Sequence, residues 1–278
     1  MQARRPLTTM AASVLLAAGL AACGTGDDSA GKPAVEPNSD SPSSLENVES
    51  MRPRPGDCHA MTLRQVTATS ADDTSSDCRQ RPTTITVAVG DLKVKGNEVS
   101  PDSNAAQDLM RRTCQPKVAT WLGADAGDLR LSRLTAVWFV PTPEQVEAGA
   151  SWFRCDVIGF DRGDHLQPLP PPARLKGSLK GDGGARYALC GTAKPGAKRF
   201  QRVACSLKHS WTAIAAIDIS GGKKYPGDKV VREDGDGACS DKVREQSGGA
   251  TTYDYGWEWP TRQQWLAGQH YGLCWAPA

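Results

Sequence analysis

The sequence predicts an α+β fold made of two tandem, similar domains stapled by disulfides, and three observations carry this prediction. The stretch 138–155, which runs from a tryptophan to a cysteine, recurs without a gap at 257–274, an offset of 119 residues. Eight cysteines beyond the first 50 residues fall into two groups of four. Short alternating apolar runs accompany amphipathic segments, as expected when a helix packs on a small antiparallel sheet. Such small cores commonly need covalent crosslinks.

Each copy of the repeat carries the signals that begin and end a short helix. A threonine N-cap is followed three residues later by glutamine, as a capping box requires, and a glycine stands where a left-handed residue ends the helix. These residues are Thr142, Gln145 and Gly149 in the first copy and Thr261, Gln264 and Gly268 in the second. Pro143 suits the first helical position, where its missing N–H costs nothing. The aromatic and apolar stretches that follow, 151–159 and 269–275, are predicted strands.

The amino end has the pattern of a bacterial lipoprotein signal. Arg4 and Arg5 precede an apolar run at 10–18, which is too short to span a bilayer. Leu20-Ala21-Ala22-Cys23 matches a lipobox. This resemblance implies that Cys23 carries acyl chains such as palmitate and holds the protein at the extracytoplasmic face of the cell membrane. The alternative is an ordinary secretory signal with an incidental cysteine.

Composition divides the chain into five predicted segments. Residues 1–22 are the signal peptide, and 23–52 form an acidic, Ser- and Pro-rich tether that cannot bury enough surface to fold. The Pro- and Gly-rich segment 161–185 is a predicted linker. It separates a first domain at 53–160 from a second at 186–278. Beyond the signal, no stretch is apolar enough to cross a membrane.

An even number of cysteines in an exported chain indicates disulfides. No CxxC occurs, and the histidines lack zinc-site spacing, so a metal site is a poor alternative. Four cysteines in one domain allow three pairings. We expect the first to pair with the second and the third with the fourth. The pairs are Cys58–Cys78, Cys114–Cys155, Cys190–Cys205 and Cys239–Cys274.

Matching strands follow the second cysteine of each group, at 83–89 and 210–217. The alternation of Ile85, Val87 and Val89 predicts a half-buried strand with these three side chains on one face.

Helices are predicted around the third cysteine of each group. In 104–115, Ala106, Met110 and Cys114 share one face. Pro116 should end or kink this helix, with a second piece continuing to Gly123.

A shorter helix is expected around Cys239. Asp234 or Asp236 would cap it, and Gly248 would end it. The same aspartates and Glu245 fit three positions of a calcium-loop template, but Ala238 and Cys239 stand where an oxygen ligand and a glycine are needed. Capping is therefore the favoured interpretation.

The second half resembles a known family. His209 lies four residues after Cys205, a Tyr-Pro-Gly-Asp turn occupies 225–228, and the chain closes with the Pro, Gly and Cys of the repeat. Together these features resemble the septum formation domain of bacterial envelope proteins and lipoproteins, clearly over 187–275. The first half matches less well, since Pro82 stands in place of the histidine. The resemblance implies an envelope location and a link to division and wall growth, without an active site or cofactor.

Candidate binding residues are few. His209 could carry protons or a ligand beside a disulfide, but no acid or nucleophile stands at a recognisable spacing, so a structural histidine bonded to the backbone is favoured. The stretch 174–208 holds nine basic residues and one acidic residue, and could contact lipid head groups or anionic wall polymers. A solvated loop face is the alternative. The basic candidates are Arg174, Lys176, Lys180, Arg199 and Arg202.

Tryptophans offer a second type of binding surface. Trp138, Trp257, Trp259 and Trp265 could line a sugar-binding face. Because Trp138 and Trp257 occupy equivalent places on a duplicated strand, a core position is favoured for both.

The sequence as a whole favours a lipid-anchored, non-enzymatic protein that binds or scaffolds envelope components. Its expected partners are the membrane, reached through Cys23, and anionic envelope polymers or division and wall proteins. Nucleic acid is excluded for an exported chain, and no cofactor is expected. No Gly-x-Ser-x-Gly, His-Glu-x-x-His or phosphate loop occurs. A wall-acting hydrolase or redox enzyme is the alternative.

Overall fold

The structure is a computed structural model that describes residues 52–70 and 75–278. The signal peptide, Cys23 and nearly all of the tether lie outside the described residues. All of the described residues belong to one compact unit. Within the described ranges, no helix combines the length and apolar character that a membrane span requires.

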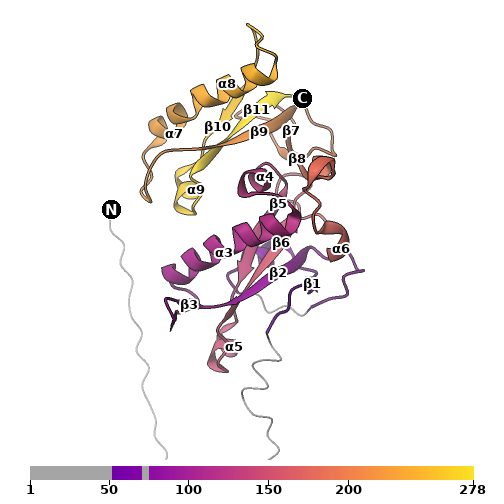
Figure 1. The fold of residues 1–278 in the computed structure, drawn as a ribbon, viewed down its shortest axis with the longest axis vertical. Helices are drawn as coiled ribbons and strands as arrows, with labels where there is room; N and C mark the ends of the chain where they lie inside the picture. Colours follow the sequence, from indigo (N-terminus) through magenta and orange to yellow (C-terminus); the bar gives the residue numbers. More distant parts are fainter. Residues whose placement is uncertain (1–51, 71–74) are drawn as a thin grey trace, which may run out of the picture. The chain divides into compact units, whose positions relative to one another are not determined.

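The first half is an antiparallel sheet of strand order β1-β2-β6-β5 (Figure 1). Its strands are β1 Cys58–His59, β2 Thr84–Asp91, β5 Leu134–Phe139 and β6 Trp152–Gly159. A small hairpin pairs β3 Lys93–Val94 with β4 Asn97–Glu98. The helices are α2 Leu63–Val66, α3 Asn104–Leu122, α4 Ala126–Arg130 and α5 Pro143–Glu147.

The second half is an antiparallel sheet of order β10-β11-β9-β7-β8. Its strands are β7 Leu189–Gly191, β8 Arg202–Ala204, β9 Trp211–Asp218, β10 Gly256–Glu258 and β11 Tyr271–Pro277. Its helices are α7 Asp228–Asp234, α8 Asp236–Gln246 and α9 Arg262–Leu266. Between the sheets come α6 Pro172–Leu175 and a 3-10 helix, η1, Gly181–Tyr187. The fold is therefore α+β, as predicted.

The two sheets share one topology. Without β8, the second order reads β7-β9-β11-β10 and matches β1-β2-β6-β5. Trp138 pairs with Cys155, and Trp257 pairs with Cys274, so the repeat has the same register in both sheets. A β-bulge also falls at corresponding places, opposite the last cysteine of each group. Such a bulge bends and twists its strand, so its recurrence indicates one backbone design used twice.

The repeated helix signals act as predicted. Thr142 and Thr261 each cap a short helix through a capping box with the glutamine three residues on. Gly149 and Gly268 then take positive φ angles of 98° and 96°. Only glycine adopts this conformation without steric cost, so the spacing fixes both the helix and the turn into the next strand.

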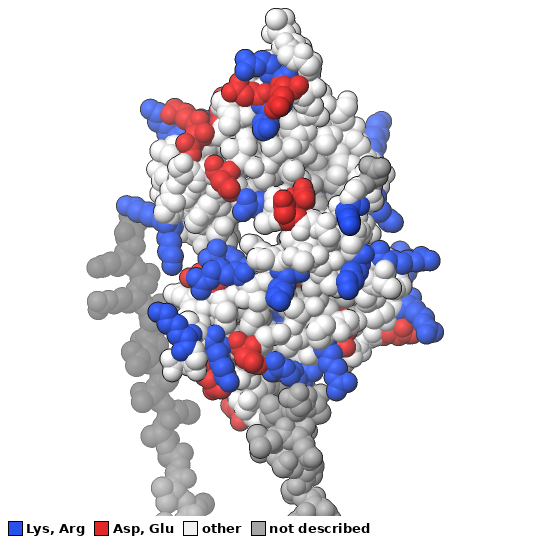
Figure 2. Space-filling view, viewed as in Figure 1, with Lys and Arg blue, Asp and Glu red and all other residues white. Residues whose placement is uncertain are grey.

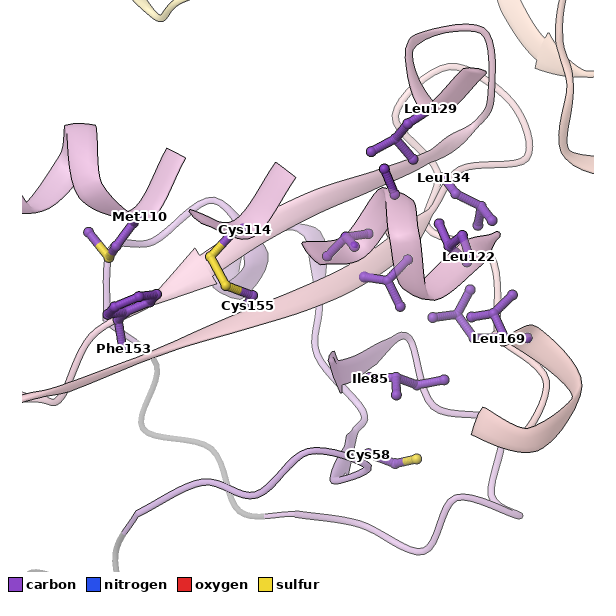
Figure 3. Close-up of a cluster of buried hydrophobic side chains, with 14 of the residues drawn as sticks. Cys58, Ile85, Met110, Cys114, Leu122, Leu129, Leu134, Phe153, Cys155 and Leu169 are labelled. Atoms are coloured by element: carbon purple, nitrogen blue, oxygen red, sulfur yellow. A yellow bond between two sulfur atoms is a disulfide. The ribbon is translucent and has the colours of Figure 1, made fainter. Parts of the chain in front are cut away.

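The core of the first half lies between α3 and the sheet. Ala106, Met110 and Cys114 are fully buried along one face of α3. Figure 3 shows Met110 beside Phe153 and the disulfide that joins Cys114 to Cys155. A fully buried side chain of this kind stabilises the fold by roughly 1.5–3 kcal/mol.

All four disulfides have the predicted partners. Their Cα–Cα distances are 5.2 Å for Cys58–Cys78, 5.0 Å for Cys114–Cys155, 5.0 Å for Cys190–Cys205 and 5.2 Å for Cys239–Cys274. In each half, one bridge ties the first strand to the segment after it, and the other ties a helix to the last strand. The second arrangement fixes the helix layer on its sheet.

Pro116 does not end α3, which continues to Leu122 and stops at Gly123 with φ 79°. Proline removes one backbone hydrogen bond. The last turns nevertheless bury Val118, Ala119 and Leu122, and this tertiary packing outweighs the local cost.

The bulge corrects the predicted alternation in β2. Thr86 pairs with Asp156 and Ala88 with Cys155, so Val87 is the extra residue. Ile85 and Val87 pack against the first core as the alternation predicts, but Ala88 then takes the place predicted for Val89.

Neither predicted aspartate caps α8. Its N-cap is Gly235, and no side chain makes a capping bond there. Asp234 instead ends α7, a helix that the sequence analysis did not predict, and Asp236 is the first residue of α8. The carboxyls have other partners, described below. Gly248 follows the end of α8 with φ 70°, as expected.

The predicted linker is part of the packed structure. Leu169 and Leu175 are buried in the first core. Backbone bonds then join the halves, from Arg133 N–H to Tyr187 O (2.6 Å) and from Leu189 N–H to Leu131 O (2.8 Å). The segment 161–185 therefore continues the first core and leads directly into the second sheet.

Candidate binding cleft between the two sheets

A cleft of ≈ 590 Å³ lies where α3 and β5 of the first half meet α9 of the second. Its volume is within the range of small-molecule binding sites. Aromatic, amide and charged side chains converge on it. The lining residues are Asn104, Gln107, Asp108, Arg111, Trp138, Lys223, Trp265, Leu266, Ala267, Gly268 and His270.

Trp138 is the aromatic side chain that the first sheet contributes to the cleft. It packs partly against the first core and is half-buried. Its Nε1–H donates to Gln107 Oε1 at 3.1 Å. Gln107 lies one helical turn from Asn104 and from Arg111, so α3 presents an amide-and-guanidinium edge beside the indole.

Charges in the cleft are organised around Asp108. Arg111 donates to its carboxylate at 2.8 Å, and Lys223 reaches the other oxygen at 3.5 Å. The hydrogen bond from Arg111, followed by the charge of Lys223, lowers the pKa of Asp108. The carboxylate therefore stays ionised at neutral pH, and two cations face one anion. Figure 2 shows Lys and Arg gathered over the region of α3.

The α9 side of the cleft is held by contacts within the second half. Trp265 is fully buried, stacks on His270 with ring centroids 4.3 Å apart, and donates to Gly222 O at 3.2 Å. His270 Nε2 is bonded to Trp265 O at 3.1 Å. Leu266 is 62% exposed at the rim. A wall fixed in this way needs little ordering when a ligand binds.

Trp257, the counterpart of Trp138, lies outside the cleft. It is 7% exposed, and its Nε1–H donates to Val231 O at 3.3 Å. The predicted core position is therefore right for Trp257 and only partly right for Trp138. Trp259 packs against the second core beside Arg232.

His209 lies away from the cleft and makes the backbone bond expected of a structural histidine. Its Nδ1–H donates to Leu207 O at 2.7 Å. A ring nitrogen and the sulfurs of Cys190 and Cys205 lie within 4.8 Å of one another. Because those sulfurs form a disulfide, they offer no thiolate to a metal ion.

The structure does not bring the predicted basic residues into one site. Arg174, Lys176 and Lys180 are exposed on the segment bonded to the end of α3. Arg199 is exposed on the β7–β8 turn, and Arg202 pairs with Glu258 at 2.8 Å. The first three lie near the helix end that favours positive charge.

The calcium template is not a loop in the structure. Asp234 accepts a bond from Ser220 N–H at 2.8 Å, and Asp236 accepts one from Tyr255 O–H at 3.1 Å. Both residues and Glu245 belong to helices. The carboxyls thus position neighbouring segments of the second half.

A buried polar cluster on the first sheet is absent from the sequence analysis. Arg154 lies 3.2 Å from His59 and 3.2 Å from Asp156, and His59 is bonded to Thr86 at 3.2 Å. All four residues are at most 3% exposed. Arg154 and Asp156 stand two residues apart within the otherwise apolar β6 and must therefore share one face of the sheet. This spacing was the signal in the sequence that could have predicted the cluster. The burial favours a structural role.

The cleft residues of α3 were also missed. Asn104, Gln107, Asp108 and Arg111 recur at helical spacing, which predicts a polar face. The sequence does not reveal what this face meets, because α9 lies more than 140 residues further along the chain.

Comparison with protein families found a match. The model of the septum formation family matches residues 43–274 in one span that includes both sheets. The chain therefore belongs to the septum formation family. Searches among curated proteins and among solved structures found no match.

Proposed function

We propose that this protein is a lipid-anchored, extracytoplasmic binding protein that takes part in septum formation by holding a wall glycan in the cleft. The cleft is the observation that carries the proposal. Pyranose rings present a C–H face that stacks on an indole, and their hydroxyl and amide groups need donors and acceptors nearby. Trp138 supplies the aromatic surface, and Gln107, Asn104 and Arg111 supply the polar groups.

The location outside the cytoplasm has two supports. Four disulfides favour an oxidising compartment. The lipobox at 20–23 is the predicted membrane anchor.

The binding is non-enzymatic. In the cleft, Asp108 is held ionised between two cations, so it has no proton to donate to a ligand. The partners envisaged are anionic wall polymers and the division or wall proteins that work on them.

Sedimentation with purified insoluble cell wall tests the proposal. The full chain should pellet with the wall, and Trp138→Ala should weaken binding about tenfold, or roughly 1.4 kcal/mol. Trp259→Ala is the matched control, since Trp259 is a partly buried tryptophan outside the cleft lining. Equal loss in both variants, or no sedimentation of the unmodified chain, would reject the assigned site.

A turnover assay separates binding from catalysis. We expect the full chain to leave soluble wall fragments and small disulfides unchanged, and His209→Ala to bind wall like the parent protein. Wall cleavage or disulfide exchange that disappears in a folded His209→Ala protein would establish the hydrolase or redox alternative.

Anchoring is tested in the native cell. Mass spectrometry should find a diacyl or triacyl group on Cys23, and Cys23→Ala should release the protein from the membrane. Unchanged membrane association of Cys23→Ala would contradict the lipoprotein assignment.

A further inference from the structure

A second cavity, of ≈ 270 Å³, lies at the junction of the halves and shares no lining residue with the cleft. We call it the arginine pocket, because Arg130, Arg133 and Arg202 all line it. They come from the end of α4, the residue before β5, and β8. Asp164, Gln269 and Tyr271 are among the other lining residues.

Arg133 is the central group of this pocket. It is 8% exposed, and its Nη2–H donates to the carbonyl of Gly163. Its guanidinium lies 5.3 Å from the ring centroid of Phe160. Within the described part of the chain, its Nε is buried without a hydrogen-bond partner. A buried donor left unbonded is costly, and a ligand oxygen in the pocket would satisfy it.

Each of the other two arginines forms one ion pair. Arg130 forms an ion pair with Asp218 at 2.8 Å and lies 4.1 Å from the Tyr271 ring centroid. Arg202 pairs with Glu258 at 2.8 Å. A guanidinium has five N–H donors, and one carboxylate occupies at most two of them. Both arginines therefore keep donors for another acceptor.

Nearby carboxylates do not fully compensate Arg133. Burial, followed by the charge of Arg202, lowers the pKa of Arg133 to about 10, although Asp164 and Asp161 act in the opposite direction. Asp164 is exposed, and Asp161 is also bonded to His165 at 2.9 Å. Neither carboxylate is the acceptor for Arg133 Nε, which remains available to a ligand oxygen.

We propose that the arginine pocket binds a phosphate ester group. One guanidinium satisfies a planar carboxylate with two parallel bonds, whereas three guanidiniums from three different elements suit the several oxygens of a tetrahedral phosphate. The volume holds a phosphate with part of its alcohol. The ester belongs either to a phosphorylated soluble or wall-bound molecule or to a phospholipid head group.

Calorimetric titration of the full chain with inorganic phosphate, in chloride buffer of matched ionic strength, tests the pocket. We expect Arg133→Gln and Arg202→Gln each to weaken binding about tenfold or more. Arg174→Gln should bind normally, because Arg174 is exposed and outside the pocket. Arg133 is buried, so circular dichroism is used to check that Arg133→Gln is folded. If that variant is unfolded, the affinity of Arg202→Gln decides the test.

Two further probes identify the source of the ester. Competition by glycerol 3-phosphate would indicate a soluble ester. Arg202-dependent sedimentation of Cys23→Ala protein with phosphatidylglycerol vesicles, but not phosphatidylcholine vesicles, would indicate a lipid. Absence of phosphate binding, or equal affinity in the parent, Arg202→Gln and Arg174→Gln proteins, would overturn the proposal. The wall-sedimentation test of the cleft is independent of the phosphate-binding test, so the two proposals can fail separately.

Discussion

Trp138 and Trp257 occupy the same register in two sheets of the same topology, yet their surroundings differ. Trp257 is sealed into the second core, whereas Trp138 is half-buried and lines the cleft. The comparison shows that the strands and disulfides preserve a frame, while the side chains beside each tryptophan decide whether its ring is buried.

The two tryptophans differ in burial because the residue two positions before the last cysteine differs between the halves. In β11 it is Gly272, and a Cβ there would overlap the ring of Trp257. Gly235 also contacts this ring, and a Cβ at Gly235 would overlap it. In β6 the corresponding residue is Phe153, which is buried and lies over Gly90. Phenylalanine fills in the first core the space that Trp257 fills in the second, so Trp138 remains at the surface of its sheet.

The shared frame is tested by removing both disulfides of one half. The loops closed are 20 and 41 residues long in the first half and 15 and 35 in the second. The chain-entropy model gives a loss of about 7 kcal/mol in either half. Cysteine-to-alanine variants should therefore lose cooperative unfolding in urea to a similar extent. Severe loss in one half and native stability in the other would break the equivalence.

The difference between the tryptophans predicts unequal costs of truncation. Trp257→Ala leaves a cavity in the second core and should lower the free energy of unfolding by about 3–5 kcal/mol. Trp138→Ala should cost less than about 2 kcal/mol, because its ring is already partly hydrated. Urea denaturation measures both. Similar costs would remove the basis for treating Trp138 as a binding residue.

Gly272→Ala sharpens the steric explanation. The added methyl must displace the Trp257 ring, at a cost of about 1–3 kcal/mol. Gly237→Ala is the matched control, since a Cβ at Gly237 meets no atom within 4 Å. Thermal unfolding should separate the two variants. Equal melting temperatures would mean that Gly272 is not what admits Trp257.

The smallest predicted effect concerns pH and the charges between the halves. Because the pKa of Asp108 is lowered, its ion pairs stabilise the fold above the unfolded pKa near 3.8 and are lost as pH falls through the folded value. The stability difference between the parent and Asp108→Asn should therefore be present at neutral pH and vanish in strong acid. A difference independent of pH would assign Asp108 a role other than its charge.

Local chemistry explains what could be predicted from the sequence. Capping boxes and left-handed glycines act over a few residues, and they predict the short helices. The order of the cysteines within each group predicts the disulfide partners. The missed features depend on tertiary contacts. Burial of Leu122 carries α3 past Pro116, and a bulge at Val87 reverses the alternation of β2. The cleft and the arginine pocket combine side chains from distant segments, which no local pattern identifies.

Fluorine NMR of the protein labelled with fluorotryptophan tests the central claim most directly. The resonances of Trp138 and Trp257 are assigned from Trp138→Phe and Trp257→Phe, and soluble wall glycan fragments are then added. The Trp138 resonance should shift progressively with glycan concentration, and the Trp257 resonance should stay in place. An unmoved Trp138 resonance, or an equal shift of both, would contradict the proposal that one copy of the repeat binds while the other supports the core.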